Sequence, residues 1–439
     1  MRKRWGLWIG MLALCTALTA GCGSNTEERS DIAQGEEKVA DVFANPSEPV
    51  TIRLFQQYAG LSDLDFATLM KEPVEKKFPN VTLELVRATS KVGPAELIAQ
   101  GEFPDFIFTS SQNMIDFKNF DLPQDLNEFV TKYKVDLNRF EPAAITEIKS
   151  FGENGQLYAL PFSLNFGLLF YNKTIFDQAG VPYPKDDMTW EQVVDLAKRI
   201  GAKVGDKYAA FDPNPITRMS ISWLLQKVDP NTNRAVFLTD GWKKLYEMYA
   251  EIHSIPGNAK YGDEGNRFYK DKNAAMIIGY GGLLGYLEQA HLQGQDSSFW
   301  DFVTFPQRSD GPKGLETEVR ILIMSSLSKN KDVAFRLMNY LTSDEVQTIV
   351  SRKAQRSSLK DNKTRELFGT DFESLKGKNV QAIFRQQYNP NPKGTPYDNA
   401  VKPPLFDAFK RMVNNKEDVN TALQRAQEEA NKMIDAMKK

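Results

Sequence analysis

The segment from Gly155 to Gly201 constrains the fold most, because apolar runs in it alternate with residues that end or begin regular structure. Its first apolar run, Leu157 to Leu160, meets Pro161, which supplies no backbone N–H and so ends a strand or lies at its edge. The run Phe166 to Tyr171 is long enough for a buried strand. Asn172 to Gly180 then predicts a short helix, with the glycine just past its end.

A second helix follows in the same segment. Thr189 and Gln192 have the spacing of a capping box, in which each side chain bonds a backbone N–H that the first helical turn leaves free. Apolar residues then repeat on one helical face at Val193, Leu196, Ala197 and Ile200. This order of strands and helices is typical of α/β proteins.

Five short motifs in this segment occur in a fixed order: Tyr158 with Leu160-Pro161, Leu168 to Lys173, Phe176 to Gly180, Pro182 or Pro184, and Thr189-Trp190-Glu191. Together they resemble the core of the extracellular solute-binding proteins of bacterial ATP-driven (ABC) importers, the family that includes maltose-binding protein. A second similar stretch runs from Arg320 to Gln347, where Thr342 to Glu345 predicts another capping box. The alternative is an unrelated α/β protein with a common strand–helix unit.

The resemblance implies an α/β, two-lobed, periplasmic-binding-protein-like fold of type II, with a ligand cleft between lobes joined by a three-crossing hinge. We expect lobe 1 to comprise residues 50–163 plus 318–357, and lobe 2 residues 164–317 plus 358–439. The crossings are then expected near Pro161 to Asn165, Thr317 to Arg320 and Arg356 to Lys360. Three parallel crossings make a hinge, since each absorbs a small backbone rotation while the lobes stay rigid.

The first 22 residues are typical of a bacterial lipoprotein signal. Arg2, Lys3 and Arg4 precede an apolar run that is too short for a membrane span. Leu18 to Cys22 matches the lipobox, so residues 1–21 are predicted to be a signal peptide and Cys22 to be lipidated. Two or three acyl chains on that residue suffice for stable anchoring. The alternative is an ordinary cleaved signal with an incidental cysteine.

Residues 22–49 are predicted to be the lipidated cysteine and a flexible tether, because acidic residues dominate and large apolar ones are few. Removal of residues 1–21 would change the formal net charge from −2 to −5, since three cations leave with them.

The chain shows no basic stripe with interleaved aromatics, so we expect no nucleic-acid partner. The expected location is the outer face of the bacterial cytoplasmic membrane.

The sequence offers little for catalysis. Cys15 leaves with the signal and Cys22 is acylated, so no thiol remains for a disulfide, a metal or a nucleophile. The two histidines, His253 and His291, lie in polar or helix-end settings, and metalloprotease, nucleophile-elbow and phosphate-loop motifs do not occur. We therefore expect no enzymatic activity, no cofactor and no metal. A glycoside hydrolase with a carboxylate pair remains the alternative from another class.

Strands and helices alternate after the tether. Strands are predicted at Val50 to Gln57, Val81 to Val86 and Asp105 to Phe108, with helices at Asp63 to Phe78 and Pro94 to Gln100. Such a pattern implies right-handed parallel crossovers, and ligands of open α/β sheets lie beyond the carboxyl ends of strands. Those ends are Gln56 to Tyr58 and Thr109 to Gln112.

The second half is predicted to contain amphipathic helices at Arg218 to Val228 and Gly241 to His253. Lys272 to Tyr280 resembles a family strand that ends in a cleft-lining aromatic, with Tyr280 where tryptophan is usual. The last helix, Glu417 to Lys438, should dock on a lobe rather than form a coiled coil. Its stripe comprises Val419, Leu423, Ala426, Ala430, Met433 and Met437.

Aromatic rings stack on sugar faces while amide, carboxylate and guanidinium groups read the hydroxyls. The candidate ligand contacts are Phe55, Gln56, Tyr58, Gln112, Asn165, Trp223, Tyr280 and Arg320. For each one, core packing or an ordinary surface position is the alternative. Trp223 is the favoured stacking platform on the second lobe, with Phe55 or Tyr58 opposite.

The resemblance implies a monomeric receptor that captures a small-molecule solute and delivers it to the transmembrane permease subunits of an ABC transporter. A carbohydrate, foremost an oligosaccharide, is the expected ligand. A peptide or another polyhydroxylated compound is the alternative. The sequence itself does not name the sugar.

Overall fold

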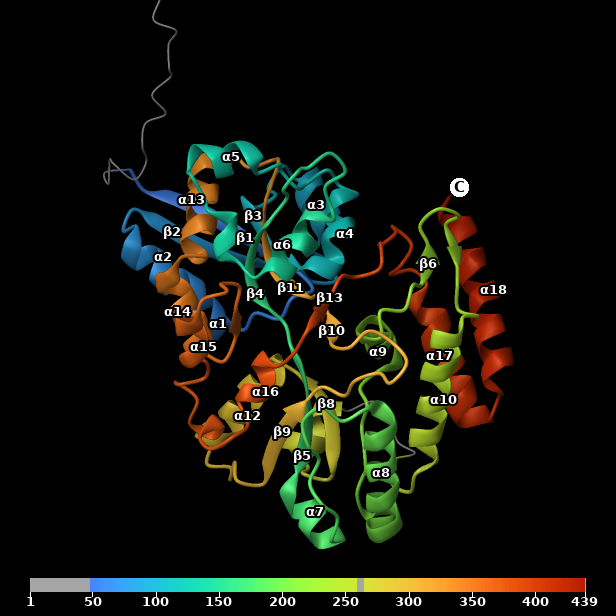
Figure 1. The fold of residues 1–439 in the computed structure, drawn as a ribbon. Helices are drawn as coiled ribbons and strands as arrows, with labels where there is room; N and C mark the ends of the chain where they lie inside the picture. Colours follow the sequence, from blue (N-terminus) through green and yellow to red (C-terminus); the bar gives the residue numbers. More distant parts are fainter. Residues whose placement is uncertain (1–47, 259–263, 439) are drawn as a thin grey trace, which may run out of the picture.

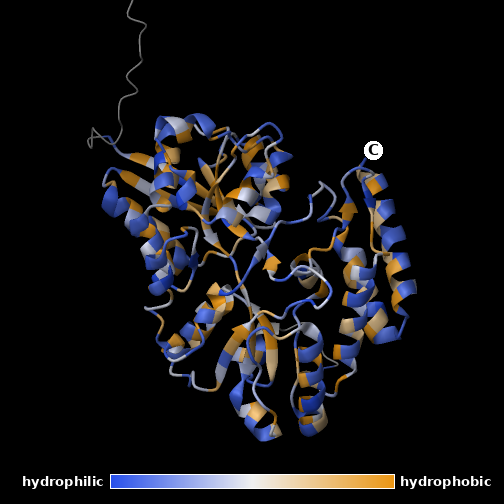
Figure 2. Cartoon of the chain, viewed as in Figure 1, coloured by the Kyte–Doolittle hydropathy of each residue, from blue (hydrophilic) through white to orange (hydrophobic). Residues whose placement is uncertain are grey.

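The computed structural model describes residues 48–258 and 264–438, which form two lobes around separate sheets (Figure 1). The predicted signal peptide, the lipidated Cys22 and nearly all of the tether lie outside the described residues. In Figure 2 the strands are mostly hydrophobic, whereas the outer faces of the helices are mostly hydrophilic. The helices therefore turn their apolar sides toward the interior of each lobe.

The first lobe is built on a six-stranded sheet with the order β12-β4-β11-β3-β1-β2. Its strands are β1 (Val50–Gln56), β2 (Val81–Arg87), β3 (Phe106–Ser110), β4 (Leu160–Leu164), β11 (Val319–Met324) and β12 (Arg356–Ser357). β1 pairs in parallel with β2 and β3, as the alternating pattern predicted. β11 lies antiparallel between β3 and β4, so the sheet is mixed.

Pro161 lies inside β4 rather than at its end. β12 pairs with Ser163 and Leu164 but does not extend to Pro161, which therefore lies at a local edge of the sheet. The expectation that this proline terminates a strand is wrong, and the edge alternative is confirmed. The pairing of β4 with β11 is irregular between Arg320 and Ile321, opposite the same part of the strand.

Helices cover both faces of this sheet. They are α1 (Asp63–Phe66), a π-helical turn (Ala67–Lys71), α2 (Glu72–Lys77), α3 (Pro94–Ala99), α4 (Met114–Lys118), α5 (Asn127–Lys132), α6 (Pro142–Lys149), α13 (Lys331–Leu341) and α14 (Asp344–Arg352). The helix runs without a break from Asp63 to Lys77, and its π-helical turn lies directly before α2, the part that contains Pro73. Ser343 rather than Thr342 caps α14, and the third helical residue is then Val346, which has no polar side chain to bond back, so the predicted capping box is wrong.

The second lobe contains a three-stranded sheet in which β5 (Gly167–Asn172) lies antiparallel between β8 (Met276–Tyr280) and β9 (Trp300–Thr304). The predictions for this segment are confirmed. The Asn172 side chain caps α7 (Lys173–Ala179), and Gly180 ends that helix with φ 63°. Thr189 and Gln192 form the predicted capping box of α8 (Trp190–Val204).

The predicted helix at Arg218 to Val228 is wrong in extent. α9 spans Ile216–Ser222, and Leu224 then adopts φ 55°, a left-handed conformation that turns the chain away from the helix axis. The short hairpin β6 (Val228–Asp229) and β7 (Arg234–Ala235) follows, and α10 (Asp240–Ser254) matches the next predicted helix.

The C-terminal helix α18 (Val419–Met437) packs on α17 (Lys402–Asn415) and α10, as predicted. Its buried stripe contains Ile434, whereas the predicted members Met433 and Met437 are exposed. The remaining elements are α11 (Glu264–Tyr269), α12 (Gly282–Leu292), α15 (Asn362–Glu366), α16 (Gln381–Phe384), β10 (Leu315–Glu316) and β13 (Tyr388–Asn389).

The chain passes directly from one sheet to the other between β4 and β5. A second passage joins β10 to β11 of the first lobe. β10 pairs in parallel with β13 in a separate two-stranded sheet near this junction (Figure 1). The residue boundaries that we assign to the lobes remain a prediction.

Candidate functional site

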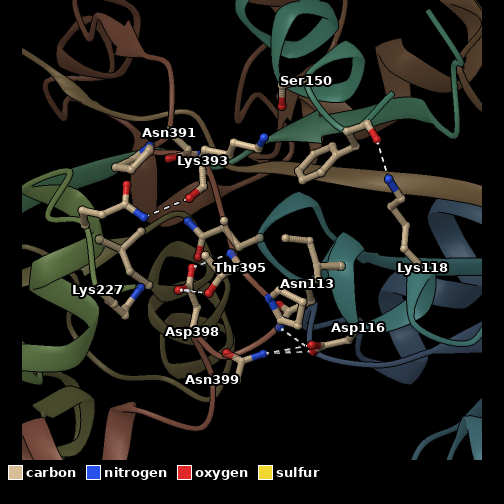
Figure 3. Close-up of a pocket in the computed structure, with 18 of the residues that line it drawn as sticks. Asn113, Asp116, Lys118, Ser150, Lys227, Asn391, Lys393, Thr395, Asp398 and Asn399 are labelled. Carbon is tan, nitrogen blue, oxygen red and sulfur yellow. Dashed lines mark hydrogen bonds between the residues drawn. The ribbon is translucent and has the colours of Figure 1, made fainter. Parts of the chain in front are cut away.

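A cavity of about 920 Å³ lies between the lobes (Figure 3). One wall comes from the first lobe, namely the turn after β3, α4 and α6. The other wall comes from the end of α9, from residues 224–227 and from the segment between β13 and α17. This volume falls in the range of small-molecule binding sites.

The first-lobe wall begins where β3 ends. The Ser110 hydroxyl caps a short 3-10 turn, which places Gln112 and Asn113 at the cavity. The Gln112 Nε2 atom is buried without a hydrogen-bond partner among the described residues. An unused buried donor is costly in a folded protein, and a bound acceptor would relieve that cost.

Asp116, on α4, connects the two walls. Its carboxylate accepts hydrogen bonds of 3.2 and 3.0 Å from the side-chain amide of Asn399, which lies just before α17 (Figure 3). Tyr58 also approaches this carboxylate. Burial, together with the charge of Asp116 and a hydrogen bond to it, raises the pKa of Tyr58 to about 12.

Glu147, on α6, is a buried carboxyl group in the same wall. Burial raises its pKa to about 7, although hydrogen bonds from Asn391 and Ser111 oppose the shift. The Asn391 side chain donates to Glu147 Oε1 over 2.8 Å and to the Thr317 carbonyl over 2.6 Å. This asparagine therefore ties the second-lobe segment to both the first lobe and the junction.

The second-lobe wall depends on the left-handed Leu224, after which Gln226 and Lys227 line the cavity. The Gln226 amide donates to the Val228 and Lys393 carbonyls over 2.7 and 2.9 Å, which holds the wall together. Burial lowers the pKa of Lys227 to about 8, with the charge of Asp398 opposing the shift.

Asp398 and Lys402 complete this wall. Asp398 accepts a hydrogen bond of 2.8 Å from the Thr395 hydroxyl, and burial raises its pKa. Burial lowers the pKa of the Lys402 ammonium, while the carboxylates of Asp116 and Asp398 oppose that effect.

A network of ion pairs lies behind the cavity, at the junction of the lobes. Arg218, on α9, pairs with Glu316 at 2.5 Å and with Glu318 at 3.0 Å. Glu318 also accepts hydrogen bonds from Ser110 and Asn165 over 3.1 and 2.9 Å. Because Ser110 belongs to the first lobe and Arg218 to the second, Glu318 links the two lobes.

Several predicted contacts lie in or near these two polar regions. Gln112 lines the cavity, and Tyr58 is 54% exposed and reaches Asp116. Asn165 belongs to the ion network. The Tyr280 ring lies 3.8 Å from the Arg218 guanidinium, and its hydroxyl hydrogen-bonds Ser222 over 2.7 Å.

The other predicted contacts already have partners elsewhere. Phe55 has no exposed surface and packs against Phe103 and Phe117 in the first-lobe core. Gln56 bonds the Ala59 carbonyl and Arg87, and Arg320 bonds Gln355. Phe55 is therefore a correction to the expected ligand surface, because the core encloses its ring. Gln56 and Arg320 are partly exposed and remain predictions.

Trp223 is likewise a core residue rather than an open stacking platform. It is 6% exposed, and its ring lies 6.1 Å from that of Trp190. The Arg308 guanidinium covers it at 4.9 Å. A sugar ring would have to displace this packing to reach it, so Trp223 is not retained in the proposed site.

Sequence reasoning missed the segment from Asn391 to Lys402, which supplies much of the second wall. Its run of proline, glycine and asparagine is typical of a loop, and loops held between rigid elements often carry binding residues. It also missed Lys227, because the predicted helix hid the turn at Leu224.

Two further searches cover residues 48–258 and 264–438. No group of three or more histidine, cysteine, aspartate or glutamate side chains there is arranged to hold a metal ion. No helix in the same part of the chain has the length and apolar character needed to cross a membrane.

The chain is similar in sequence to known sugar-binding proteins. A lactose-binding protein of Rhizobium radiobacter is 30% identical over 108 residues, which cover 24% of this chain and 20% of that protein. A multiple sugar-binding protein of Streptococcus mutans is 27% identical over 210 residues, covering 47% and 43%. The matched part of the chain thus spans less than half the length of either relative.

A solved structure shows the same fold. It is an ABC substrate-binding protein of Listeria monocytogenes in complex with cycloalternan, with a TM-score of 0.72 and 17% identity. The alignment covers 88% of this chain and all of the other. The family model described as bacterial extracellular solute-binding protein matches residues 65–348, more than half of the chain. The chain therefore belongs to the family of bacterial extracellular solute-binding proteins.

Proposed function

We propose that this protein captures a carbohydrate, foremost an oligosaccharide, and delivers it to the permease subunits of an ABC importer. The observation that carries the proposal is the cavity of about 920 Å³ whose polar walls come from both lobes. Amide, carboxylate and ammonium groups there can read sugar hydroxyls. The names of the lactose-binding and multiple sugar-binding relatives support the ligand class.

Capture is proposed to involve closure of the lobes about three crossings, with lobe 1 at 50–163 plus 318–357 and lobe 2 at 164–317 plus 358–439. The ligand can shift the open and closed populations only by its different affinity for the two states. Contacts from both walls, such as those of Gln112 and Lys227, give it that difference. The protein is proposed to act as a monomer.

The ligand class is tested by thermal unfolding of the mature chain with a panel of plant and microbial oligosaccharides. A sugar at about 100 times its dissociation constant should raise the free energy of unfolding by about 2.7 kcal/mol. Peptides and polyols form the comparison arm. Stabilisation by peptides with none by any sugar would contradict the proposal.

Binding is proposed to occur without turnover. Incubation of the purified protein with each sugar that it binds should leave the sugar intact by chromatography. Shortened products in amounts exceeding the protein would instead indicate a carboxylate-pair hydrolase.

The protein is also proposed to be anchored at the outer face of the cytoplasmic membrane through a lipidated Cys22. The lipobox at Leu18 to Cys22 supports this, because acylation of that cysteine gives enough chains for stable anchoring. Cys22→Ala should abolish incorporation of labelled fatty acid and release the protein from membranes. Incorporation equal to that of the unaltered chain would contradict the anchor.

A further inference from the structure

We propose that the solute bound in this cavity carries a negative charge, as a carboxylate or a phosphate on the sugar, and that Lys227, Lys393 and Lys402 receive it. This inference rests on the proposed function and narrows its ligand class. All three lysines line the second-lobe wall.

The three ammonium groups are unused in the structure. None of them makes a hydrogen bond or an ion pair of 4 Å or less with any residue of the described chain. Lys118 on the opposite wall shows the contrast, since its ammonium donates to the Phe151 carbonyl over 2.8 Å (Figure 3). The unused cations are therefore concentrated on one wall.

The carboxylates of the cavity already have partners. Thr395 bonds Asp398, and Asn399 bonds Asp116. Glu147 accepts from Asn391, and burial raises its pKa to about 7, so near neutrality it is only partly ionised. Glu153 is exposed at the rim. A ligand that enters the cavity thus meets free cationic donors and largely occupied acceptors.

Lys393 is exposed, whereas Lys227 and Lys402 are half-buried. Burial makes the unpaired ammonium of Lys227 unfavourable. It lowers the pKa of Lys227 to about 8, and the positive charges of Lys402 and Arg218 act in the same direction. Asp398, toward which Lys227 points in Figure 3, only partly offsets this. An anion placed between the lysines would favour the charged form and receive charge-assisted hydrogen bonds.

The opposite wall adds a neutral donor. Gln112 Nε2 is buried and unpartnered among the described residues. A carboxylate or phosphate offers several acceptor positions, so one group can accept from an ammonium and an amide together. A neutral sugar hydroxyl would accept from fewer of these donors and would not neutralise the positive charge of the lysines.

The experiment titrates the mature chain with one oligosaccharide library before and after oxidation of its primary hydroxyls to carboxylates. A third arm uses sugar phosphates beside their unphosphorylated sugars. The anionic form of at least one pair should bind about tenfold more tightly than its neutral form, the size expected for hydrogen bonds to a charged group. The oxidised and phosphorylated arms distinguish the two sources of charge.

Lys227→Gln should remove most of that preference. The control is Lys203→Gln, which makes the same change of net charge at an exposed position on α8 and should preserve the preference. Neutral sugars that bind as tightly as their anionic forms would overturn this inference and leave the proposed function standing. No binding in any arm would overturn the proposed function itself.

Discussion

The junction of the lobes contains two groups of buried or half-buried charged side chains, which differ in whether they are paired. In the ion network, the Arg218 guanidinium pairs with two carboxylates, Glu316 and Glu318. In the cavity wall, the ammonium groups of Lys227 and Lys402 have no such partner among the described residues. Both groups lie close enough for Arg218 to affect the pKa of both lysines.

This difference in pairing separates charged residues that stabilise the fold from charged residues that can bind a ligand. A buried charge with matched partners holds the surrounding segments in register, and removal of one partner is costly. A cation left unpaired beside a cavity destabilises the empty protein and favours a ligand that supplies the missing charge. Substitutions in the network should therefore affect mainly stability, whereas those in the wall should affect mainly affinity.

The largest effect is expected for Arg218→Met, which leaves the fully buried Glu316 without its partner. Loss of one member of such a pair should lower the free energy of unfolding by about 4 kcal/mol. Urea denaturation followed by tryptophan fluorescence measures this change. The double variant Arg218→Met/Glu316→Gln should recover part of the lost free energy of unfolding. If the free energy of unfolding of the single variant lay within about 1 kcal/mol of that of the unaltered protein, the ion network would not have the stabilising role assigned to it.

Trp223→Ala should lower the free energy of unfolding by about 3 kcal/mol, because a core indole packed against Trp190 is replaced by a void. The affinity of the folded fraction for its sugar should stay nearly unchanged. Calorimetric titration below the unfolding transition measures this affinity. A large loss of affinity without loss of stability would restore Trp223 as a stacking platform.

Glu147→Gln should remove a pH dependence of stability between about pH 4.3 and 7, the window between the pKa values of an unfolded and of this folded carboxyl group. In that window the unfolded chain has lost the proton while the folded chain keeps it, so rising pH favours unfolding. At pH 8 the variant should be more stable by about 2 kcal/mol.

This Glu147→Gln variant keeps an acceptor for Asn391, which makes it a conservative test of the charge alone. Chemical denaturation at pH 5 and pH 8 provides the measurement. Parallel stabilities of the variant and the unaltered protein at both pH values would show that Glu147 is ionised in the folded state.

The sequence predicted those parts of the fold that depend on local chemistry. Asn172, Gly180 and Thr189 act on backbone groups within four residues, so their roles as caps could be read directly. The buried strand β5 was equally clear, since every residue in it is apolar, aromatic or small until the capping asparagine.

The cavity depended on packing that no local pattern encodes. The helix predicted from Arg218 ends early because Leu224 adopts a left-handed conformation, and this brings Lys227 to the wall. The segment from Asn391 to Lys402 bonds Glu147 and Asp116 of the first lobe, which lie far from it in the sequence. Trp223 and Phe55 looked like ligand contacts because their burial depends on partners distant in sequence.

The smallest effect is expected at the contact that joins the walls on the solvent side. Asn399 donates to both oxygens of Asp116 in an exposed position, so the bonds contribute to this arrangement of the lobes rather than to the interior of either. Asn399→Ala should therefore change the free energy of unfolding by less than about 1 kcal/mol.

Under the proposed closure of the lobes, this contact joins the walls of the closed state, so its loss should weaken sugar binding about fivefold, the equivalent of about 1 kcal/mol. Asn420→Ala, an exposed substitution on α18, is the control. Small-angle scattering should show a larger radius of gyration for the free Asn399→Ala protein than for the free control. Saturating sugar should bring both to the same value, since the ligand then supplies the contacts between the walls. Equal affinities and equal radii would mean that this bond forms as readily in the open state, and closure would then depend on the lysine wall and its ligand alone.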